Sequence, residues 1–327
     1  MVQLGPFRIE NPVWLAPMAG ITDLPFRLLC RELGAGHAIS EMQSSNPRLR
    51  NSAKSQARMR HQGEPAPIHV QIAGSEPEEM AAAAVFNVAQ GADIIDINMG
   101  CPAKKVCRKL AGSSLLQNEG LVAAILEAVV SAVDVPVTLK TRTGWCRESR
   151  NAVRIGRLAE QLGISCITLH GRTRNDFYKG EAEFDTFRRL RDAVSIPLVA
   201  NGDIRDAETA ARILEECGAD AVMIGRAAQA RPWLPGTCAR RITGGEPERE
   251  PDLTTKRDIL LRLVESLHRF YGADGGCRMA RKHIVAQIEA LNPPRDLRQS
   301  ILKAPEPGLQ MHLLKTLFDD HRISLAA

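Results

Sequence analysis

The sequence predicts a (β/α)8 TIM barrel followed by a small all-helical domain. Short β-branched segments alternate with amphipathic segments over about 230 residues, the usual size of such a barrel. Polar residues also gather at the carboxyl end of each strand segment, the edge where barrel enzymes build their sites. A doubly wound open sheet is the alternative, but it would concentrate the polar residues near one switch point.

The strand segments are mostly unbroken apolar sequences, such as ADIIDI, VPVTL and IPLVA. Such sequences are typical of parallel strands that are covered by helices. The segments 76–91 and 206–218 begin with acidic residues and end at glycine, which is the polarity expected of helices. The predicted strands are Trp14–Ala19, His37–Met42, Ile68–Ala73, Asp93–Met99, Pro136–Arg142, Cys166–Gly171, Ile196–Asn201 and Ala221–Gly225.

The strand pattern stops after Pro235, and a Gly/Pro/charge-rich segment, TGGEPEREPD, follows at 243–252. Helical periodicity then returns over 255–272 and 277–291 without further strands. We therefore predict a barrel domain at 1–240 and a helical domain at 241–327. The second helical segment carries one cationic cluster, composed of Arg278, Arg281, Lys282 and His283.

Composition narrows the class of protein. The chain has 327 residues, a net charge of +5 and only 4% aromatic residues, which disfavours a surface of stacking rings for single-stranded nucleic acid. The N-terminal segment lacks the pattern of a signal peptide, and no apolar run is long enough to span a membrane. The eight cysteines are scattered and form no C-x-x-C pair. We therefore expect a cytoplasmic protein without a metal site or disulfides.

The last two predicted strands end in VANGDI and MIGRA. Glycines at these ends, Gly202 and Gly225, let backbone N–H groups approach an anion, and Arg226 can bind it. Barrels often bind a phosphate with the loops after strands seven and eight. The alternative is that both glycines serve only tight turns.

Three further polar residues, Gln71, Lys140 and His170, end strands that are otherwise apolar. A single histidine in this position is more often structural than catalytic. Burying an unpaired ammonium is costly, so Lys140 indicates a function. It could be a Schiff-base nucleophile or a cation facing an electron-rich ring, and the sequence alone does not distinguish these roles.

The segment INMGCPAKKVCRK, residues 97–109, places Cys101 in a loop between glycine and proline. A thiolate there would be a nucleophile and a thiol would be a proton donor, and the neighbouring charges do not decide between them. Cationic residues also follow several other predicted strands, which suggests a polyanionic partner. Those nearest to the cysteine are Lys104, Lys105, Arg108 and Lys109.

Taken together, these motifs resemble the tRNA-dihydrouridine synthases. LAPMAGITDLPFR, VQIAGS, GADIIDINMGCPAKKVCRKLAGSSLLQN, VPVTLKTRTGW, LHGRTR, NGDI and GADAVMIGRAAQARPW occur in family order, and RMARKH follows. The resemblance is closest to the bacterial B-type subgroup. One departure is Cys107, where some relatives have asparagine.

The resemblance implies that FMN binds at the carboxyl face of the barrel and is reduced by NADPH or NADH. Hydride then reaches C6 of specific D-loop uridines in tRNA, and Cys101 protonates C5. The implied FMN contacts are Pro17, Met18, Ala19, Gln71, Lys140, His170, Asn201, Gly202, Asp203, Gly225 and Arg226. The implied tRNA contacts are Asn98 and Arg142 at the uracil, with Lys104, Lys105, Arg108, Lys109, Arg278, Arg281 and Lys282 at the backbone.

We expect a monomer. Three other functions remain open on the sequence: a flavin oxidoreductase of free pyrimidines, an aldolase or isomerase that uses Lys140, and a non-catalytic RNA-binding regulator. The cationic loop and the helical domain disfavour a small free substrate, which needs neither.

Overall fold

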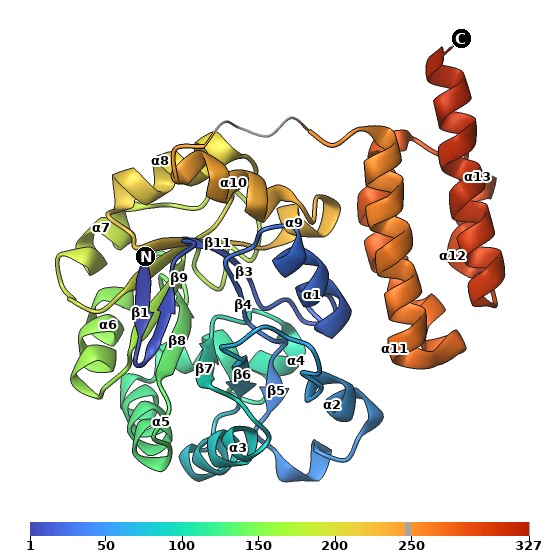
Figure 1. The fold of residues 1–327 in the computed structure, drawn as a ribbon. Coiled ribbons are helices and arrows are strands. Elements are labelled where there is room, and N and C mark those ends of the chain that lie inside the picture. Colours follow the sequence, from blue (N-terminus) through green and yellow to red (C-terminus); the bar gives the residue numbers. More distant parts are fainter. Residues whose placement is uncertain (246–249, 327) are drawn as a thin grey trace. The chain divides into compact units, whose positions relative to one another are not determined.

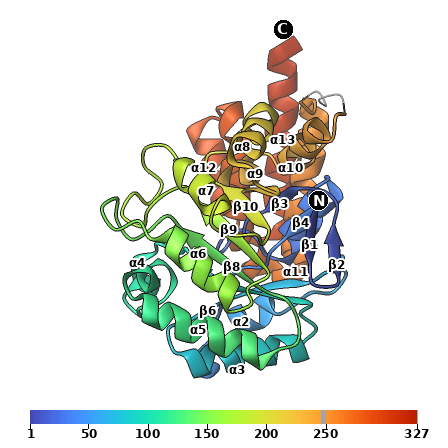
Figure 2. The same cartoon turned by 90° about the vertical axis from the view of Figure 1, so that its left-hand side faces the viewer.

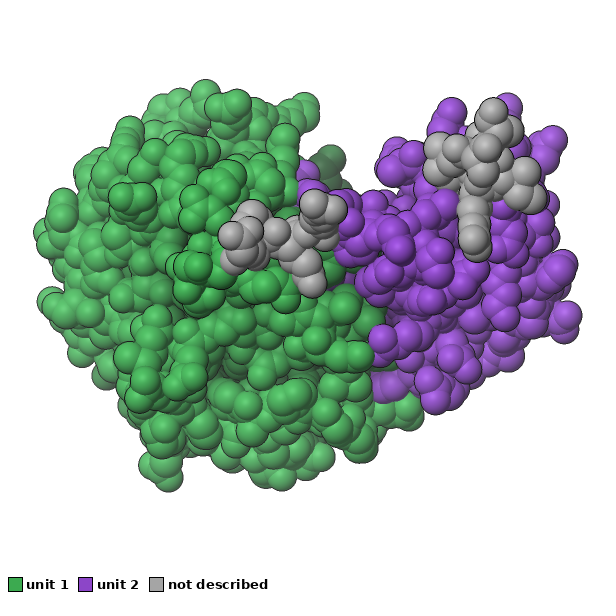
Figure 3. All heavy atoms as spheres, turned by 45° about the horizontal axis from the view of Figure 1, so that its top comes forward, with its two compact units in different colours: residues 1–225, 233–246 green, residues 226–232, 247–327 purple. Residues whose placement is uncertain are grey.

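The structure is a computed structural model that describes residues 1–245 and 250–326, with side chains to residue 320. The chain forms two compact units, coloured in Figure 3. One contains residues 1–225 and 233–246, and the other contains 226–232 and 247–327. The sequence predicts a domain boundary after residue 240, and the nearest boundary between the two units of the structure follows residue 246. The predicted linker at 243–252 lies partly outside the described residues.

The first unit is a parallel barrel, as the sequence predicts. Its sheet has nine strands in the order β4-β3-β11-β10-β9-β8-β7-β6-β5. Neighbouring strands along this order pair in parallel, and a parallel bridge joins Ile39, the residue after β4, to His69 of β6, so the sheet curls back on itself. The strands are β3 (Val13–Leu15), β4 (His37–Ala38), β5 (Gln43–Ser44), β6 (His69–Ala73), β7 (Ile94–Met99), β8 (Val137–Arg142), β9 (Cys166–His170), β10 (Leu198–Asn201) and β11 (Ala221–Ile224).

Helices lie outside these strands (Figures 1 and 2). Several begin at side-chain caps, where Asp23, Asn118 and Asp206 accept hydrogen bonds from backbone N–H groups of the first turn. The helices of this unit are α1 (Leu24–Glu32), α2 (Ala53–Arg58), α3 (Pro77–Ala89), α4 (Lys104–Cys107), α5 (Glu119–Ala132), α6 (Ala152–Gln161), α7 (Asp185–Arg191), α8 (Ala207–Cys217) and α10 (Leu234–Ile242), with short 3-10 turns at Pro47–Leu49 and Gly112–Gln117.

Two strands differ from their predicted ranges by more than two residues at one end or in their continuity, and the others differ by one or two. The strand predicted at Trp14–Ala19 ends at Leu15, and the backbone N–H of Met18 then bonds to the Thr22 hydroxyl. The strand predicted at His37–Met42 is divided into β4 and β5. Between them the buried Glu41 accepts hydrogen bonds from Arg58 and from the backbone of Gly20. Side-chain bonding to the loop backbone therefore replaces regular strand geometry at both places.

An N-terminal hairpin, which the sequence analysis did not predict, closes the bottom of the barrel. It consists of β1 (Val2–Leu4) and β2 (Phe7–Ile9), paired antiparallel. Its buried side chains share one apolar cluster with residues that begin barrel strands, including Ile94, Cys166 and Ala221. The amino-terminal end of the barrel is therefore filled mainly with apolar side chains, together with the buried His37 and His69 that begin β4 and β6.

The second unit is helical in all its described elements. Its longest helix, α11 (Leu253–Ile288), bends at Gly272, whose φ of 76° is accessible mainly to glycine. Within the core of this unit, His268 Nε2 lies 2.8 Å from Gln310 Oε1. The other elements are α9 (Arg226–Ala230), a 3-10 turn at Glu289–Leu291, α12 (Arg295–Lys303) and α13 (Pro307–Ala326). Across the described part of the chain, no helix has the length and apolar character needed to cross a membrane.

We expect Leu4→Ala to lower the free energy of unfolding of the barrel by about 3 kcal/mol, because it leaves a cavity in a closed apolar layer. Leu4 is fully buried in the hairpin cluster. Urea unfolding followed by tryptophan fluorescence measures this, since Trp14, Trp145 and Trp233 all belong to the first unit.

The control is Arg8→Ala on the same hairpin, where the exposed side chain forms only a surface ion pair with Glu10. That substitution should change stability by less than about 0.5 kcal/mol. A loss of less than about 1 kcal/mol for Leu4→Ala would show that the hairpin does not seal the barrel.

Candidate active site

Five of the predicted site residues meet at the carboxyl end of the barrel. Gln71, Asn98, Lys140, His170 and Asn201 come from β6, β7, β8, β9 and β10 in turn. The strand register places Asn98 beside Lys140 and His170 beside Asn201. The barrel therefore brings together residues that lie as much as 130 positions apart in the chain.

Lys140 is buried, and its ammonium donates a 2.9 Å hydrogen bond to Asn201 Oδ1. Asn201 is itself held, because its Nδ2 donates to the carbonyl of Met223. Burial lowers the pKa of Lys140 to about 8, with the charge of Asp96 acting in the opposite direction. The side chain is therefore mostly protonated at neutral pH, and two of its three hydrogens remain for a ligand.

The carboxylate of Asp96 lies below this layer, within β7. It accepts hydrogen bonds from Thr138 Oγ1 at 2.6 Å and from Gln71 Nε2 at 2.7 Å. Gln71 Oε1 in turn accepts from Asn98 Nδ2 at 2.7 Å. Burial raises the pKa of Asp96 to about 6, although these hydrogen bonds and the charge of Lys140 favour the ionised form. The group is thus an anion at neutral pH.

The loop that carries Cys101 is held by side chains on both sides. Asn98 Oδ1 accepts from the backbone N–H groups of Gly100 and Cys101, at 3.1 and 2.9 Å. The Gly100 carbonyl accepts from Arg142 Nε at 2.8 Å, and the Cys101 carbonyl accepts from Ser113 Oγ at 2.9 Å. The polar backbone atoms around the cysteine are therefore satisfied within the protein, which fixes the position of the thiol.

Burial raises the pKa of the Cys101 thiol, and this outweighs the opposing hydrogen bond from the Ala103 backbone and the charges of Arg142 and Lys140. The group is therefore a thiol at neutral pH rather than a thiolate. Cys107 lies on the other side of the loop, with Sγ 3.6 Å from the Cys101 carbonyl. Cys107, the residue that departs from the family pattern, therefore contacts and supports the loop.

Arg142 is fully buried, and most of its donors are already bound. Besides the Gly100 carbonyl, it donates from Nη1 to the carbonyls of Thr173 and Phe177, both at 2.9 Å. Its guanidinium lies 5.5 Å from the ring centre of Tyr178. The predicted uracil contact of Arg142 therefore has only Nη2 available, and the main observed role is to join the cysteine loop to the loop after β9.

The predicted phosphate end combines a required glycine with a bound carboxylate. Gly202 has φ of +137°, and a Cβ there would lie 2.7 Å from Ala182. Asp203 accepts from Arg172 Nη2 at 2.6 Å and from the Ala182 backbone at 2.8 Å. Because the Asp203 carboxylate is already bound in this way, a phosphate could be held here only by the backbone N–H groups around it. A Cβ on Gly225 would meet Met18 Sδ at 3.7 Å, so the loop of Pro17, Met18 and Ala19 lies next to the end of β11.

These residues fit the flavin that the sequence resemblance implies. Lys140 and Gln71 retain N–H hydrogens at the mouth of the barrel, and these suit the carbonyl oxygens and nitrogens of an electron-rich ring. Gly202 lets the backbone approach a phosphate without a side chain in the way. Arg226 is the first residue of α9 and is exposed, and it belongs to the segment that groups with the helical unit.

The predicted tRNA-backbone cations are exposed. Lys104, Lys105, Arg108 and Lys109 surround the four-residue helix α4. Arg278, Arg281 and Lys282 are exposed on α11, and Gln229 of the same unit donates to the Lys282 carbonyl. His283, which the sequence groups with them, is instead completely buried, because the helix turns it toward its own core.

Four further residues hold the site together without having been predicted from the sequence: Asp96, Thr138, Ser113 and, as a paired buried residue, Arg172. An aspartate in the middle of the apolar segment ADIIDI was a usable signal, since a carboxylate in a buried strand needs partners. The hydroxyls of Thr138 and Ser113 gave no such signal, because their partners lie on distant segments.

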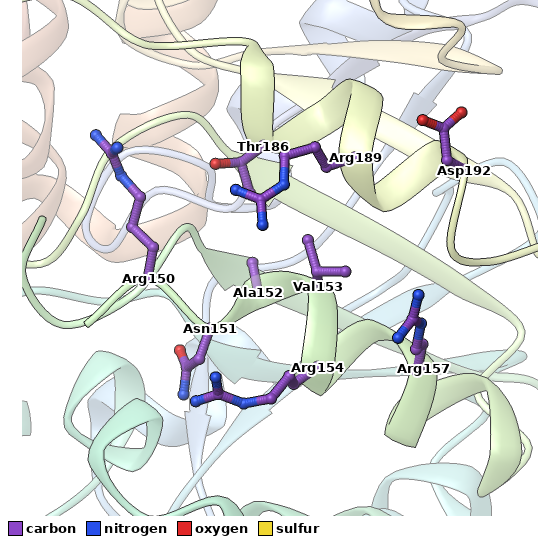
Figure 4. Close-up of a pocket in the computed structure, with 9 residues that line it drawn as sticks. All are labelled: Arg150, Asn151, Ala152, Val153, Arg154, Arg157, Thr186, Arg189 and Asp192. Carbon is purple, nitrogen blue, oxygen red and sulfur yellow. The ribbon is translucent and has the colours of Figure 1, made fainter. Parts of the chain in front are cut away.

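A separate cavity of about 380 Å³ lies between α6 and α7, away from these residues (Figure 4). Arg157 and Arg189 extend into it without an ion pair among the described residues, whereas Arg154 is bound to Glu119 and Arg150 lies 3.7 Å from Glu183. The lining residues are Arg150, Asn151, Ala152, Val153, Arg154, Arg157, Thr186, Arg189 and Asp192. Neither Cys101 nor Lys140 is among them.

Comparison with known proteins gives a consistent result. Residues 14–320 match the family model described as Dihydrouridine synthase (Dus). The chain is 52% identical over 318 residues to tRNA-dihydrouridine synthase B of Xanthomonas axonopodis pv. citri, covering 97% of this chain and 96% of that protein. It is 50% identical over 319 residues to the protein of the same name from Yersinia pestis, covering 98% and 99%.

A solved structure of a variant of NCR from Zymomonas mobilis shares the fold. Its TM-score is 0.50 at 17% identity, over 76% of this chain and 92% of that one.

We expect alkylation of Cys101 to rise with pH around a midpoint above the pKa of an exposed cysteine, about 8.5, because burial disfavours the thiolate. Iodoacetamide labelling at a series of pH values, with mass spectrometry of the tryptic peptides, measures this. Cleavage after Lys104 and Lys105 separates Cys101 from Cys107. A cysteine-containing peptide in the same tube is the control, and a Cys101 midpoint below it would contradict the thiol assignment.

Proposed function

This chain belongs to the dihydrouridine synthase family, and we propose that it reduces the C5=C6 bond of specific D-loop uridines in tRNA to 5,6-dihydrouridine. The electrons would come from NADPH or NADH through bound FMN. The observation that carries the proposal is the hydrogen-bonded loop that fixes Cys101 at the mouth of the barrel, close enough to the buried cation Lys140 to feel its charge; burial raises the pKa of the thiol there. The names of the relatives, tRNA-dihydrouridine synthase B, support the choice of substrate.

Bound FMN, when reduced, supplies hydride to C6 of the uracil ring. We propose that Gln71 and Lys140 bind the polar edge of the FMN ring, and that His170 and the loop of Pro17, Met18 and Ala19 lie near the ring. The FMN phosphate would be held by the backbone near Asn201, Gly202, Asp203, Gly225 and Arg226. Lys140 suits this position because Asn201 holds its ammonium while two hydrogens stay available. A cation there favours electron density on the ring it faces.

Cys101 is the proposed proton donor. Hydride addition at C6 leaves negative charge on C5 and the C4 oxygen of the uracil, and a proton delivered to C5 completes the reduction. A thiol whose pKa is raised by burial holds that proton at neutral pH. Asn98 Nδ2 donates to Gln71 and, at 3.8 Å, to the weak acceptor Met42 Sδ, which a uracil oxygen could replace, and Arg142 has Nη2, so each can offer one contact to the uracil oxygens.

The geometry disfavours the alternative in which Lys140 is a Schiff-base nucleophile. Such a nucleophile must be a free amine. Here the ammonium donates to Asn201 at 2.9 Å, and a Schiff-base role would leave the positioned thiol of Cys101 without a function. The free-pyrimidine alternative leaves the exposed cations of α4 without a purpose.

For tRNA, the target uridine must leave its stack to reach a site inside the barrel mouth. We propose that Lys104, Lys105, Arg108 and Lys109 bind the phosphate backbone near that site, and that Arg278, Arg281 and Lys282 bind it through the helical unit. All seven are exposed. We further propose a division of labour between a catalytic first unit and a tRNA-binding second unit, in a monomeric enzyme of the bacterial cytoplasm, where its tRNA substrate is found.

We expect Cys101→Ala to keep its flavin and lose uridine reduction by about a hundredfold or more, because only the proton donor is removed. The assay is dihydrouridine formation on unmodified tRNA with purified protein, FMN and NADPH, and flavin content is read from the visible spectrum. Cys107→Ala is the matched control, since it removes the neighbouring thiol, which contacts the Cys101 carbonyl and the Ser113 hydroxyl and has no proposed contact with the uracil. A protein that takes up no flavin, or makes no dihydrouridine as wild type, would reject the proposed function. Full activity of Cys101→Ala would reject only the donor assignment.

We expect the double substitution Lys104→Gln and Lys105→Gln to weaken tRNA binding and to reduce the slope of log K against log salt by about 1.4 to 1.8, the range for two lost phosphate contacts. Fluorescence anisotropy across a salt series measures both. The control is Arg212→Gln on α8, an exposed cation that already pairs with Glu216. An unchanged slope in the double variant would remove these lysines from the interface.

A further inference from the structure

We propose that Asp96 is a positioning residue for Cys101. Its carboxylate sets the direction of two successive amide hydrogen bonds, and the second amide holds the backbone of the cysteine loop. The inference rests on the proposed function only for the role given to the thiol; the positioning itself follows from contacts of this chain.

All the hydrogen bonds on one side of Asp96 point toward it. Thr138 has a single hydroxyl hydrogen, which it donates to Asp96 Oδ1 at 2.6 Å. The 2.9 Å contact between His69 Nε2 and Thr138 Oγ1 must therefore be donated by the histidine. His69 Nδ1 then carries no hydrogen, and it accepts from His37 Nε2 at 2.9 Å.

Both histidines are neutral in this arrangement. Burial lowers the pKa of His69 to about 3, and burial, with His69 and Arg31 adding to it, lowers that of His37 well below its usual range. No positive charge from this pair therefore compensates Asp96. The two histidines act only as a chain of hydrogen-bond donors, in which His37 donates to His69 and His69 donates to Thr138.

The other side of Asp96 leads to the active-site loop. A carboxylate can only accept, so Gln71 must turn its Nε2 toward Asp96, at 2.7 Å. Gln71 Oε1 is thereby turned to Asn98, and it accepts from Nδ2 at 2.7 Å. Asn98 Oδ1 is left facing the loop, where it accepts from the backbone N–H groups of Gly100 and Cys101. If the order of the amides reversed, two donors would face each other at the loop.

A purely structural role does not explain a carboxylate at this place. Asp96 is 1% exposed, and the cation that acts on it, Lys140, bonds instead to Asn201. Burying such a charge is costly, and replacing buried charges by apolar residues often stabilises a protein. What the carboxylate provides, and an apolar side chain would not, is an acceptor that orders the amides.

The test is the alkylation rate of Cys101 in apo protein, measured by mass spectrometry peptide by peptide. Asp96→Leu removes the acceptor, and Gln71→Met breaks the next link without touching Asp96. We expect each to raise the Cys101 rate about tenfold, because the loop loses a buried anchor and opens more often. Thr138→Val is the matched control: it removes the other hydrogen bond to the same carboxylate but leaves the amides in place, so the Cys101 rate should stay within about twofold.

The buried thiols Cys30 and Cys166 distinguish positioning from general loosening. Acceleration confined to the cysteine loop supports the proposal. Equal acceleration at Cys30 and Cys166, an unchanged Cys101 rate in Gln71→Met, or the same increase in Thr138→Val would overturn it. If Asp96→Leu does not fold, Gln71→Met decides. The readout needs neither flavin nor tRNA, so a protein that labels as expected but forms no dihydrouridine would reject the proposed function and leave this inference standing.

Discussion

The carboxylate of Asp96, buried in the middle of the barrel, must be surrounded by donors, and much of the site follows from that requirement. The two strands that neighbour β7 supply them: Gln71 on β6 and Thr138 on β8 donate to the carboxylate, and His69 on β6 donates in turn to Thr138. Parallel register supplies them, because Asp96 lies beside Gln71 on one side and Thr138 on the other. The N-terminal hairpin fills the barrel below with apolar side chains. The donors must therefore come from the protein, and their directions are fixed.

The loops at the barrel mouth are likewise held by hydrogen bonds from a few buried side chains. Arg142 and Arg172 are fully buried. Arg142 binds backbone carbonyls of the loops after β7 and β9, and Arg172 binds the carbonyls of Lys179 and Gly180 within its own loop after β9. Arg172 also pairs with Asp203, which fixes the turn at Gly202. A guanidinium has five donors in a rigid plane, so one side chain can hold several carbonyls at once. The cysteine loop and the loop after β9 are thereby joined into one frame, which suits a reaction that needs a thiol in a constant position.

Local patterns predicted the barrel and the residues at its strand ends, because both depend on periodicity and on position within a strand. Gln71, Asn98, Lys140, His170 and Asn201 could be found in this way, and the structure brings them together. The division of the second strand could not, since it depends on Glu41 bonding to Gly20 and Arg58. The sealing hairpin was also missed, because its segments contain only three residues each. Contacts that cross from one loop to another leave no periodic trace in the sequence.

The cations of this chain divide into two groups whose roles differ in kind. The arginines that follow the predicted strands suggest one continuous basic face. Arg142 and Arg172, however, are buried and donate hydrogen bonds to backbone carbonyls, so they are not part of a surface that a polyanion could contact. The charges that lower the pKa of Cys101 are those of Arg142 and Lys140, and burial still outweighs them. The exposed lysines of α4 are therefore not needed to tune the thiol, and their placement beside the loop suits the tRNA contacts proposed for them. Interior cations hold the loops of the site in place, whereas exterior cations lie where a phosphate backbone could reach them.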